Sequence, residues 1–209
     1  MYAPERLGAL TDGVFAIALT LLVLELKLPD PPPSSNLTLS EIVGTDWHPF
    51  LGWVISFIVL SRLWLIQHDT AAALTRASSR TLMINMVFLG TISLIPFAAN
   101  LISVSDLDQP LSLQMFAILV GINALVLGWF VRSAEQDQAL VEGRSPRWSH
   151  RALHHLIGVP VVSAIAVAVT VIDPAWTVLV WGIESVVVVA ILLSSGRGDD
   201  PARKTPATI

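Results

Sequence analysis

The sequence predicts an all-α integral membrane protein, and three observations lead to that fold class. Of the 209 residues, 54% are apolar and only 13% are charged, which is about half the charged share of soluble domains. The mean hydropathy is +0.70. The apolar residues form long stretches without period-two alternation, which favours helices over the strands of a membrane barrel. A spanning helix needs about 20 residues, so the chain has room for about six spans and for no separate soluble domain.

Long apolar stretches define the expected spans. The first one carries Asp12 and Glu25 and is too long for the apolar core of a cleaved signal peptide, so we expect it to remain as a span. We expect one transmembrane domain over residues 1–195, followed by a polar, disordered tail over residues 196–209. The expected spans cover residues 7–28, 50–66, 82–103, 111–131, 153–172 and 175–194. Within the third and fifth of these, Pro96 and Pro160 are the positions where a helix could break.

Charge divides the connectors between these spans into two groups. The connectors after the first, third and fifth spans contain acidic residues and no Lys or Arg. Loops rich in Lys and Arg stay in the cytoplasm, so both chain termini are expected to be cytoplasmic. An even number of spans agrees with this orientation. The basic residues of the other group are Arg6, Arg76, Arg80, Arg132, Arg144, Arg147, Arg151, Arg197, Arg203 and Lys204.

Composition and motifs exclude several classes of function. The formal net charge of −4 argues against a nucleic-acid-binding protein, which would need a basic face. Without cysteine there are no disulfides and no thiolate metal sites. The sequence contains no nucleophile elbow, no His-Glu-x-x-His zinc pair and no Walker loop, so we do not expect an enzyme. A proton- or cation-coupled secondary transporter stays open as an alternative, with Asp12, His68 and Glu184 as its relay.

The first span is the unusual one because it carries ionisable residues. Arg6 precedes the polar triplet Thr11-Asp12-Gly13. An ionisable group inside a span usually faces protein or water, so Asp12 either holds helices together or marks an aqueous pathway. Beyond Asp12, a spacing of about 100° per residue places three apolar residues on one face, with a hydroxyl beside them. This stripe, which by itself is also typical of ordinary core packing, consists of Ile17, Leu21 and Leu24, with Thr20 as the hydroxyl.

Residues 6–18 resemble the first-helix signature of the transmembrane protein 175 family. The family pattern is Arg-x-x-x-Phe-Ser-Asp followed by a Gly-Val-Phe-Ala-Ile-Ala type run. Arg6 and Asp12 match it, while Leu10 and Thr11 replace Phe and Ser. The resemblance extends over about the first hundred residues. It includes Ser56-Phe57, Trp64 and His68 in the second span, with Gln67 at a position where His is common, and Asn85, Phe88-Leu89, Ser93 and Pro96-Phe97 in the third.

The resemblance implies a fold and a function. The family consists of potassium channels of endosomes and lysosomes, with short prokaryotic relatives that have six spans and assemble as tetramers around a central pore lined by the first helix. By position, Ile17 would be the hydrophobic constriction and gate, Leu21 and Leu24 further apolar layers, and Thr20 a hydroxyl at the pore face. The polar network behind the pore helix would contain Arg6, Asp12, Trp64, His68 and Asn85.

From the resemblance we expect a potassium-permeable channel in a prokaryotic plasma membrane. Its partners would be three further copies of the chain, membrane lipids and monovalent cations, with no nucleic acid. Potassium would pass through as the permeating ion, and no cofactor or bound metal is expected. The sequence has no Thr-Val-Gly-Tyr-Gly loop, so a carbonyl filter is absent and modest potassium selectivity is expected.

Several polar residues have two interpretations each. Glu25 and Lys27 either extend to the membrane interface or, in the case of Glu25, surround the outer pore mouth. Glu184 either pairs with a neighbouring helix or serves as a proton site. The histidines at 150, 154 and 155 include an i, i+4 pair with the spacing of metal ligands. Since no third ligand accompanies them, we expect an interfacial role for His150, His154 and His155.

Overall fold

A computed structural model describes most of the chain's apolar part. The described residues are 3–24, 26, 48–104, 110–137, 139–140, 146–173, 176–177, 179–183 and 186, with the backbone alone at 48, 103–104 and 146–156. Within these ranges the long elements are all helices, and an isolated antiparallel bridge joins Leu74 and Leu140. The predicted all-α class is confirmed for this part of the chain.

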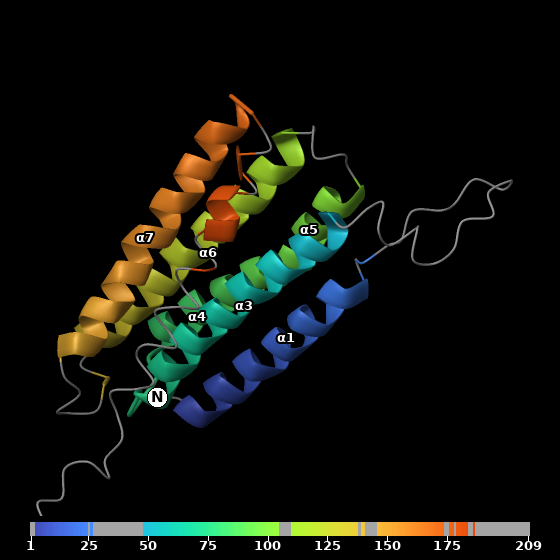
Figure 1. Cartoon of the computed structure of the whole chain (residues 1–209). Coiled ribbons are helices and arrows are strands. Elements are labelled where there is room, and N and C mark those ends of the chain that lie inside the picture. The colour runs from blue at the N-terminus through green and yellow to red at the C-terminus, as the bar shows by residue number, and fades with distance from the viewer. Residues whose placement is uncertain are drawn as a thin grey trace, which may run out of the picture.

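The helices follow the predicted spans closely. Four segments are long and apolar enough to cross a membrane, and they cover residues 4–24, 49–72, 79–102 and 110–136. A shorter apolar helix, Ile157–Thr170, lies within the fifth predicted span. With the labels of Figure 1, the helices are α1 (Pro4–Leu24), α3 (His48–Ala72), α4 (Ser79–Ile92), α5 (Ile95–Val104), α6 (Pro110–Gln136) and α7 (Pro146–Thr170).

The second and third spans differ from the prediction for physical reasons. The second span was predicted to end at residue 66, but α3 continues to Ala72. Its last turns contain Gln67 and Thr70, which are polar but completely buried, and both form hydrogen bonds inside the protein. The third span is interrupted, because α4 ends at Ile92 and α5 begins only at Ile95. Pro160, by contrast, lies inside a continuous α7.

Some predictions fall outside the described residues. Of the sixth predicted span, residues 176–177, 179–183 and 186 are described and are helical. The rest of that span, the acidic residues of the connectors after the first and third spans, and the tail over 196–209 lie outside the described part, whereas Asp173 after the fifth span is described. The same holds for Glu25, Lys27 and Glu184, and for the side chains of His150, His154 and His155.

The helices pack as a bundle with α1 at one side and α7 at the opposite side (Figure 1). The central helix α6 contacts α7, α5, α4 and α3, whereas α1 packs against α3, α4 and α5. Large side chains fill the space between them, among them Phe15, Phe88, Leu60 and Phe130, each completely buried. The rings of Phe15 and Phe88 lie 5.9 Å apart and join α1 to α4.

Helix α1 is covered on one face only. Its buried residues recur every three or four positions and form a single stripe toward α3, α4 and α5. The opposite face is uncovered in the single chain although it is mostly apolar. The buried stripe consists of Leu7, Thr11, Phe15, Ala18 and Leu22.

Candidate functional site

The uncovered face of α1 contains all the residues that the sequence assigned to a pore. Ile17 is 60% exposed, Leu21 40% and Leu24 67%. Thr20 is exposed beside them. Large apolar side chains in such a row need a partner surface, which is either lipid or another copy of the chain.

The Thr20 hydroxyl is oriented by its own helix. Its Oγ1 lies 3.0 Å from the carbonyl oxygen of Ala16 and 2.9 Å from that of Ile17. A hydroxyl has one proton, so it donates to one of these carbonyls at a time and keeps its oxygen lone pairs. Thr20 therefore presents an acceptor oxygen, rather than a donor, on the uncovered face. An acceptor oxygen is the kind of group that interacts favourably with a cation.

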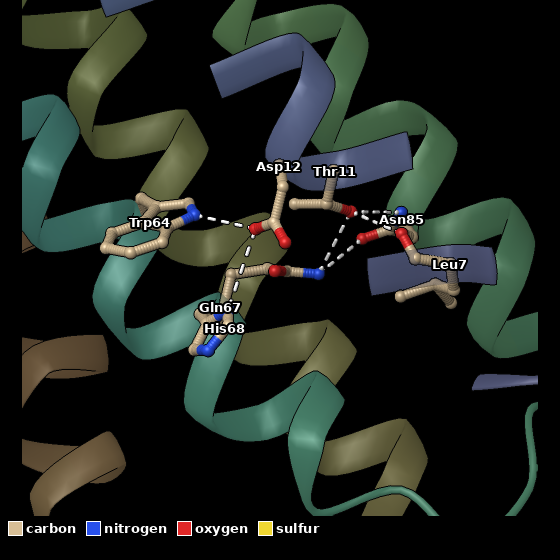
Figure 2. A network of polar contacts seen from close by, with 7 residues as sticks. All are labelled: Leu7, Thr11, Asp12, Trp64, Gln67, His68 and Asn85. Carbon is tan, nitrogen blue, oxygen red and sulfur yellow. Dashed lines mark hydrogen bonds and ion pairs between the residues drawn. The ribbon is translucent and has the colours of Figure 1, made fainter. Parts of the chain in front are cut away.

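Asp12 links α1 to α3 on the flank of the same helix (Figure 2). The indole N–H of Trp64 donates to its Oδ1 at 2.8 Å, and Nδ1 of His68 lies 3.5 Å from the same oxygen. The latter contact is an ion pair whenever His68 is protonated. The Trp64 and His68 rings lie 5.1 Å apart on successive turns of α3. The side chains of Asp12 and His68 are both nearly half exposed, so water reaches this carboxylate.

A second, completely buried cluster lies next to Asp12 and joins α1, α3 and α4. The Thr11 hydroxyl donates to the Leu7 carbonyl at 2.9 Å. It accepts from the Asn85 amide at 3.1 Å and from the Gln67 amide at 3.3 Å. The Gln67 amide also donates to Oδ1 of Asn85 at 3.0 Å. The Thr11 oxygen thus uses its one donor and both acceptor positions, and Figure 2 shows the side chains of Gln67 and Asn85 directed toward it.

The structure brings together most of the predicted polar network. Trp64 and His68 meet Asp12, whereas Asn85 meets the neighbouring Thr11 instead. Arg6 is exposed, and its side chain forms no hydrogen bond or ion pair with any described residue. The carbonyl oxygen of Gln67 is buried and finds no hydrogen-bond partner among the residues with a described placement.

Two members of the network were not assigned to it from the sequence. From the sequence, Thr11 is part of a polar triplet and a replacement for Ser, and Gln67 is a replacement for His, but neither is assigned to the network. Both are completely buried. The available signal was their polarity on otherwise apolar helices, since polar side chains inside a span usually face protein.

A family model now matches the segment that carries these features. Residues 6–96 match the family "Endosomal/lysosomal potassium channel TMEM175". The resemblance inferred from the sequence is confirmed. The match includes nearly all of α1 and the whole of α3 and α4, and therefore both polar clusters.

Curated relatives align with the same half of the chain. A potassium channel of Streptomyces collinus is 29% identical over 98 residues, which is 47% of this chain and 47% of the relative. A potassium channel of a Chryseobacterium strain is 35% identical over 104 residues, 50% of this chain and 51% of the relative. The endosomal/lysosomal proton channel TMEM175 of Gallus gallus is 30% identical over 105 residues, but this covers only 21% of its length. The chain thus spans about half the length of the bacterial relatives that it matches.

Solved structures extend the likeness beyond the aligned half. The crystal structure of a lysosomal potassium-selective channel TMEM175 homologue from Chamaesiphon minutus superposes with a TM-score of 0.75 at 22% identity. It covers 88% of this chain and 94% of that one. The structure of a T38A variant of the potassium channel MtTMEM175 superposes with a TM-score of 0.54 at 16% identity. At these identities the likeness establishes the fold, and with the apolar helices it makes this chain an integral membrane protein of that fold.

Proposed function

We propose that the chain forms a potassium-permeable cation channel, a tetramer whose central pore is lined by α1. The observation that carries the proposal is the uncovered apolar face of a helix whose other face is buried and tied to α3 and α4 by hydrogen bonds. Copies placed around an axis would turn this face inward. The bacterial relatives, which are named as potassium channels, support the same ion.

Ile17 is proposed as the gate. A ring of isoleucine side chains excludes water when it is narrow, and a dewetted ring blocks ions without any charge or plug. Ile17 is suited to this task because its side chain is 60% exposed and lies on the uncovered face of α1, outside the buried stripe. Leu21 and Leu24 would add further apolar layers toward the outer side.

Selectivity is proposed to come from Thr20 and to be modest. Since no Thr-Val-Gly-Tyr-Gly loop exists, no row of backbone carbonyls replaces the hydration shell of potassium. The Thr20 oxygen, one helical turn from Ile17, is the polar acceptor on the apolar part of the stripe. A ring of such oxygens could replace part of the hydration shell of an ion that passes the Ile17 ring.

The two polar clusters are proposed to hold α1 at a fixed distance from the pore axis. The partly exposed cluster would consist of Asp12, Trp64 and His68. The buried cluster would contain Asn85. Arg6, which is exposed at the start of α1, would lie at the cytoplasmic mouth. The residues of the two polar clusters are therefore expected to position α1 rather than to contact the ion.

The remaining features of the proposal concern the whole protein. We propose six spans within residues 1–195, both termini and the tail over 196–209 in the cytoplasm, and a place in a prokaryotic plasma membrane. The acidic outer connectors would raise the local concentration of cations. The channel would have no enzymatic activity, no cofactor and no nucleic-acid partner.

Potassium flux from liposomes tests the proposal. The Ile17→Asn variant should hydrate the ring and raise the flux, whereas Ile157→Asn should leave it unchanged. Ile157 is a matched control because it is 61% exposed, like Ile17, but lies on α7. Equal flux from wild type and Ile17→Asn would show that Ile17 is not the gate. Saturable flux that follows a pH gradient, without unitary currents, would favour the coupled transporter instead.

A further inference from the structure

Exposed arginines gather at one end of the contact between α4 and α6. The two helices are antiparallel, because Thr81 meets Ser133 near that end and Thr91 meets Asn123 further along. The segments long and apolar enough to span the membrane begin at residue 79 and end at residue 136, so this end of the contact lies at a membrane boundary. The exposed arginines there are Arg76, Arg80 and Arg132.

Two of these guanidinium groups are held by the end of α6. Nη2 of Arg76 donates to the backbone carbonyl of Asp137 at 2.9 Å, and Nη1 of Arg80 donates to Oε1 of Gln136 at 3.2 Å. Both acceptors are neutral, so these bonds orient the guanidinium groups without removing their charge. A guanidinium has several further N–H donors for another acceptor. Such donors fit the oxygens of a phosphate group well, because two of them can bind side by side.

The net charge at this end of the contact is positive. The ionisable residues within 73–92 and 110–140 are the three arginines and two acids. The carboxylate of Asp137 accepts hydrogen bonds from the hydroxyls of Ser78 and Thr81 at 2.6 and 3.3 Å, so it joins the end of α6 to the start of α4. The other acid, Glu135, is exposed. An anion at the arginines would therefore meet more positive than negative charge.

The surface beside the arginines is apolar over the depth of one membrane leaflet. On α6, exposed apolar residues recur every three or four positions and end at Trp129, one turn before the exposed arginine of that helix. From Ile118 to Trp129 the helix rises by about 16 Å, and half of a hydrocarbon core is about 15 Å thick. On α4, Met83 and Val87 are exposed in line with Arg80. The apolar stripe of α6 consists of Ile118, Ile122, Leu125 and Trp129.

We propose that this end of the α4–α6 contact binds an anionic phospholipid. The phosphate oxygens would accept hydrogen bonds from Arg76 and Arg80, and the acyl chains would lie along the apolar stripe of α6. The indole of Trp129 would lie at the membrane interface, where tryptophan is common. The stripe favours a lipid over a soluble phosphate, because a soluble anion would use the arginines alone. This inference is independent of the proposed function, since it involves neither α1 nor the passage of ions.

Native mass spectrometry of the full chain, purified in detergent, tests the lipid site. The two probes are phosphatidylglycerol, which is anionic, and phosphatidylcholine with the same acyl chains. Wild type should retain phosphatidylglycerol in severalfold excess. In Arg80→Gln the binding of phosphatidylglycerol should weaken roughly fivefold, as expected for the loss of one arginine near an anionic headgroup. Arg6→Gln is the matched control, because it removes one exposed arginine from α1 instead and should bind as wild type does.

Three results would overturn the lipid site. Wild type might retain both lipids equally, or Arg80→Gln and Arg6→Gln might lose the same amount of phosphatidylglycerol, which would be a response to net charge alone. The third result concerns Glu135→Gln, which keeps all the arginines and removes a nearby negative charge. This variant should bind phosphatidylglycerol more tightly than wild type does, and unchanged or weaker binding would contradict the site. If Arg80→Gln is too unstable to purify, Glu135→Gln decides the question.

Thermal unfolding distinguishes a lipid from a soluble anion. Phosphatidylglycerol should raise the unfolding temperature of wild type more than that of Arg80→Gln. Glycerol phosphate, which has the phosphate but no acyl chains, should raise neither. An equal rise with glycerol phosphate and with the lipid would show that the arginines bind a soluble phosphate and that the apolar stripe takes no part.

Discussion

The indole nitrogen of Trp64 donates a hydrogen bond of 2.8 Å to the carboxylate of Asp12, across the contact between α3 and α1. One turn further along α3, His68 approaches the same oxygen at 3.5 Å. Among the described residues, the partners of the carboxylate come from α3, while the buried Thr11 beside it is held from both α3 and α4. Adjacent residues of one helix thus fix its position relative to two neighbours, which leaves the opposite face of α1 available to form a pore wall.

Asp12→Asn should lower the stability of the folded protein without changing its ion selectivity. The amide oxygen of Asn still accepts from Trp64 but loses the charge that attracts a protonated His68. A hydrogen bond to a charged group contributes about 1.5–3 kcal/mol, and the exposure of Asp12 places this one at the low end. We expect a lower melting temperature and less assembled protein, with an unchanged ratio of potassium to sodium permeability. A change in that ratio with normal assembly would instead place Asp12 on the ion path.

Thr11→Val should be more damaging than its position on an apolar helix suggests. Valine keeps the shape of threonine but removes the oxygen that accepts from Gln67 and Asn85, and each buried donor left unsatisfied costs about 1–3 kcal/mol. We therefore expect a clear drop in the midpoint of thermal unfolding. Thr20→Val is the matched control for stability, since Thr20 is exposed and bonds only to its own helix. If both variants unfold at the same temperature, the buried cluster contributes little to stability.

Thr20→Val should change selectivity while leaving the fold intact. The substitution removes the acceptor oxygen from the uncovered face of α1 and keeps the branched shape of the side chain. If that oxygen replaces part of the hydration shell of potassium, the permeability ratio of potassium to sodium should fall toward one. Reversal potentials under bi-ionic conditions measure this ratio directly. Thr20→Ser, which retains the oxygen, should keep the wild-type ratio, and a loss of selectivity in both variants would point to side-chain shape instead.

The sequence predicted the membrane spans but not the contacts between side chains on different helices. The spans were predictable because about 20 apolar residues in a row have few other structures available to them. The partners of Thr11 were not, because Gln67 and Asn85 come from helices whose rotation no periodicity determines. The two prolines show the same limit. Pro96 lies in the first turn of a new helix, where its missing N–H is tolerated, whereas Pro160 sits within a continuous helix, although both looked alike in the sequence.

A close contact between α6 and α7 at Gly121 gives a prediction for the half of the bundle away from α1. A Cβ added to Gly121 would lie 3.1 Å from Cβ and 3.3 Å from Oγ of Ser163, tighter than ordinary packing. Gly121→Ala should therefore push the two helices apart and lower the unfolding temperature, despite the higher helix propensity of alanine. Gly90→Ala is the control, because an added Cβ there meets nothing within 4 Å, so it should be neutral or stabilising.

A second substitution, Ser163→Gly, should reverse the loss of stability expected for Gly121→Ala. Truncating the facing residue in the double variant Gly121→Ala/Ser163→Gly removes both crowded atoms and should restore the spacing of α6 and α7, apart from the helix propensity lost at residue 163. Because α7 packs against α6 whereas α1 does not, the gate should be insensitive to this exchange. Potassium flux per assembled particle should accordingly equal that of wild type in the double variant. A persistent defect in flux would mean that displacement of α7 reaches α1 through α6 and the helices between them, so that the far side of the bundle takes part in gating.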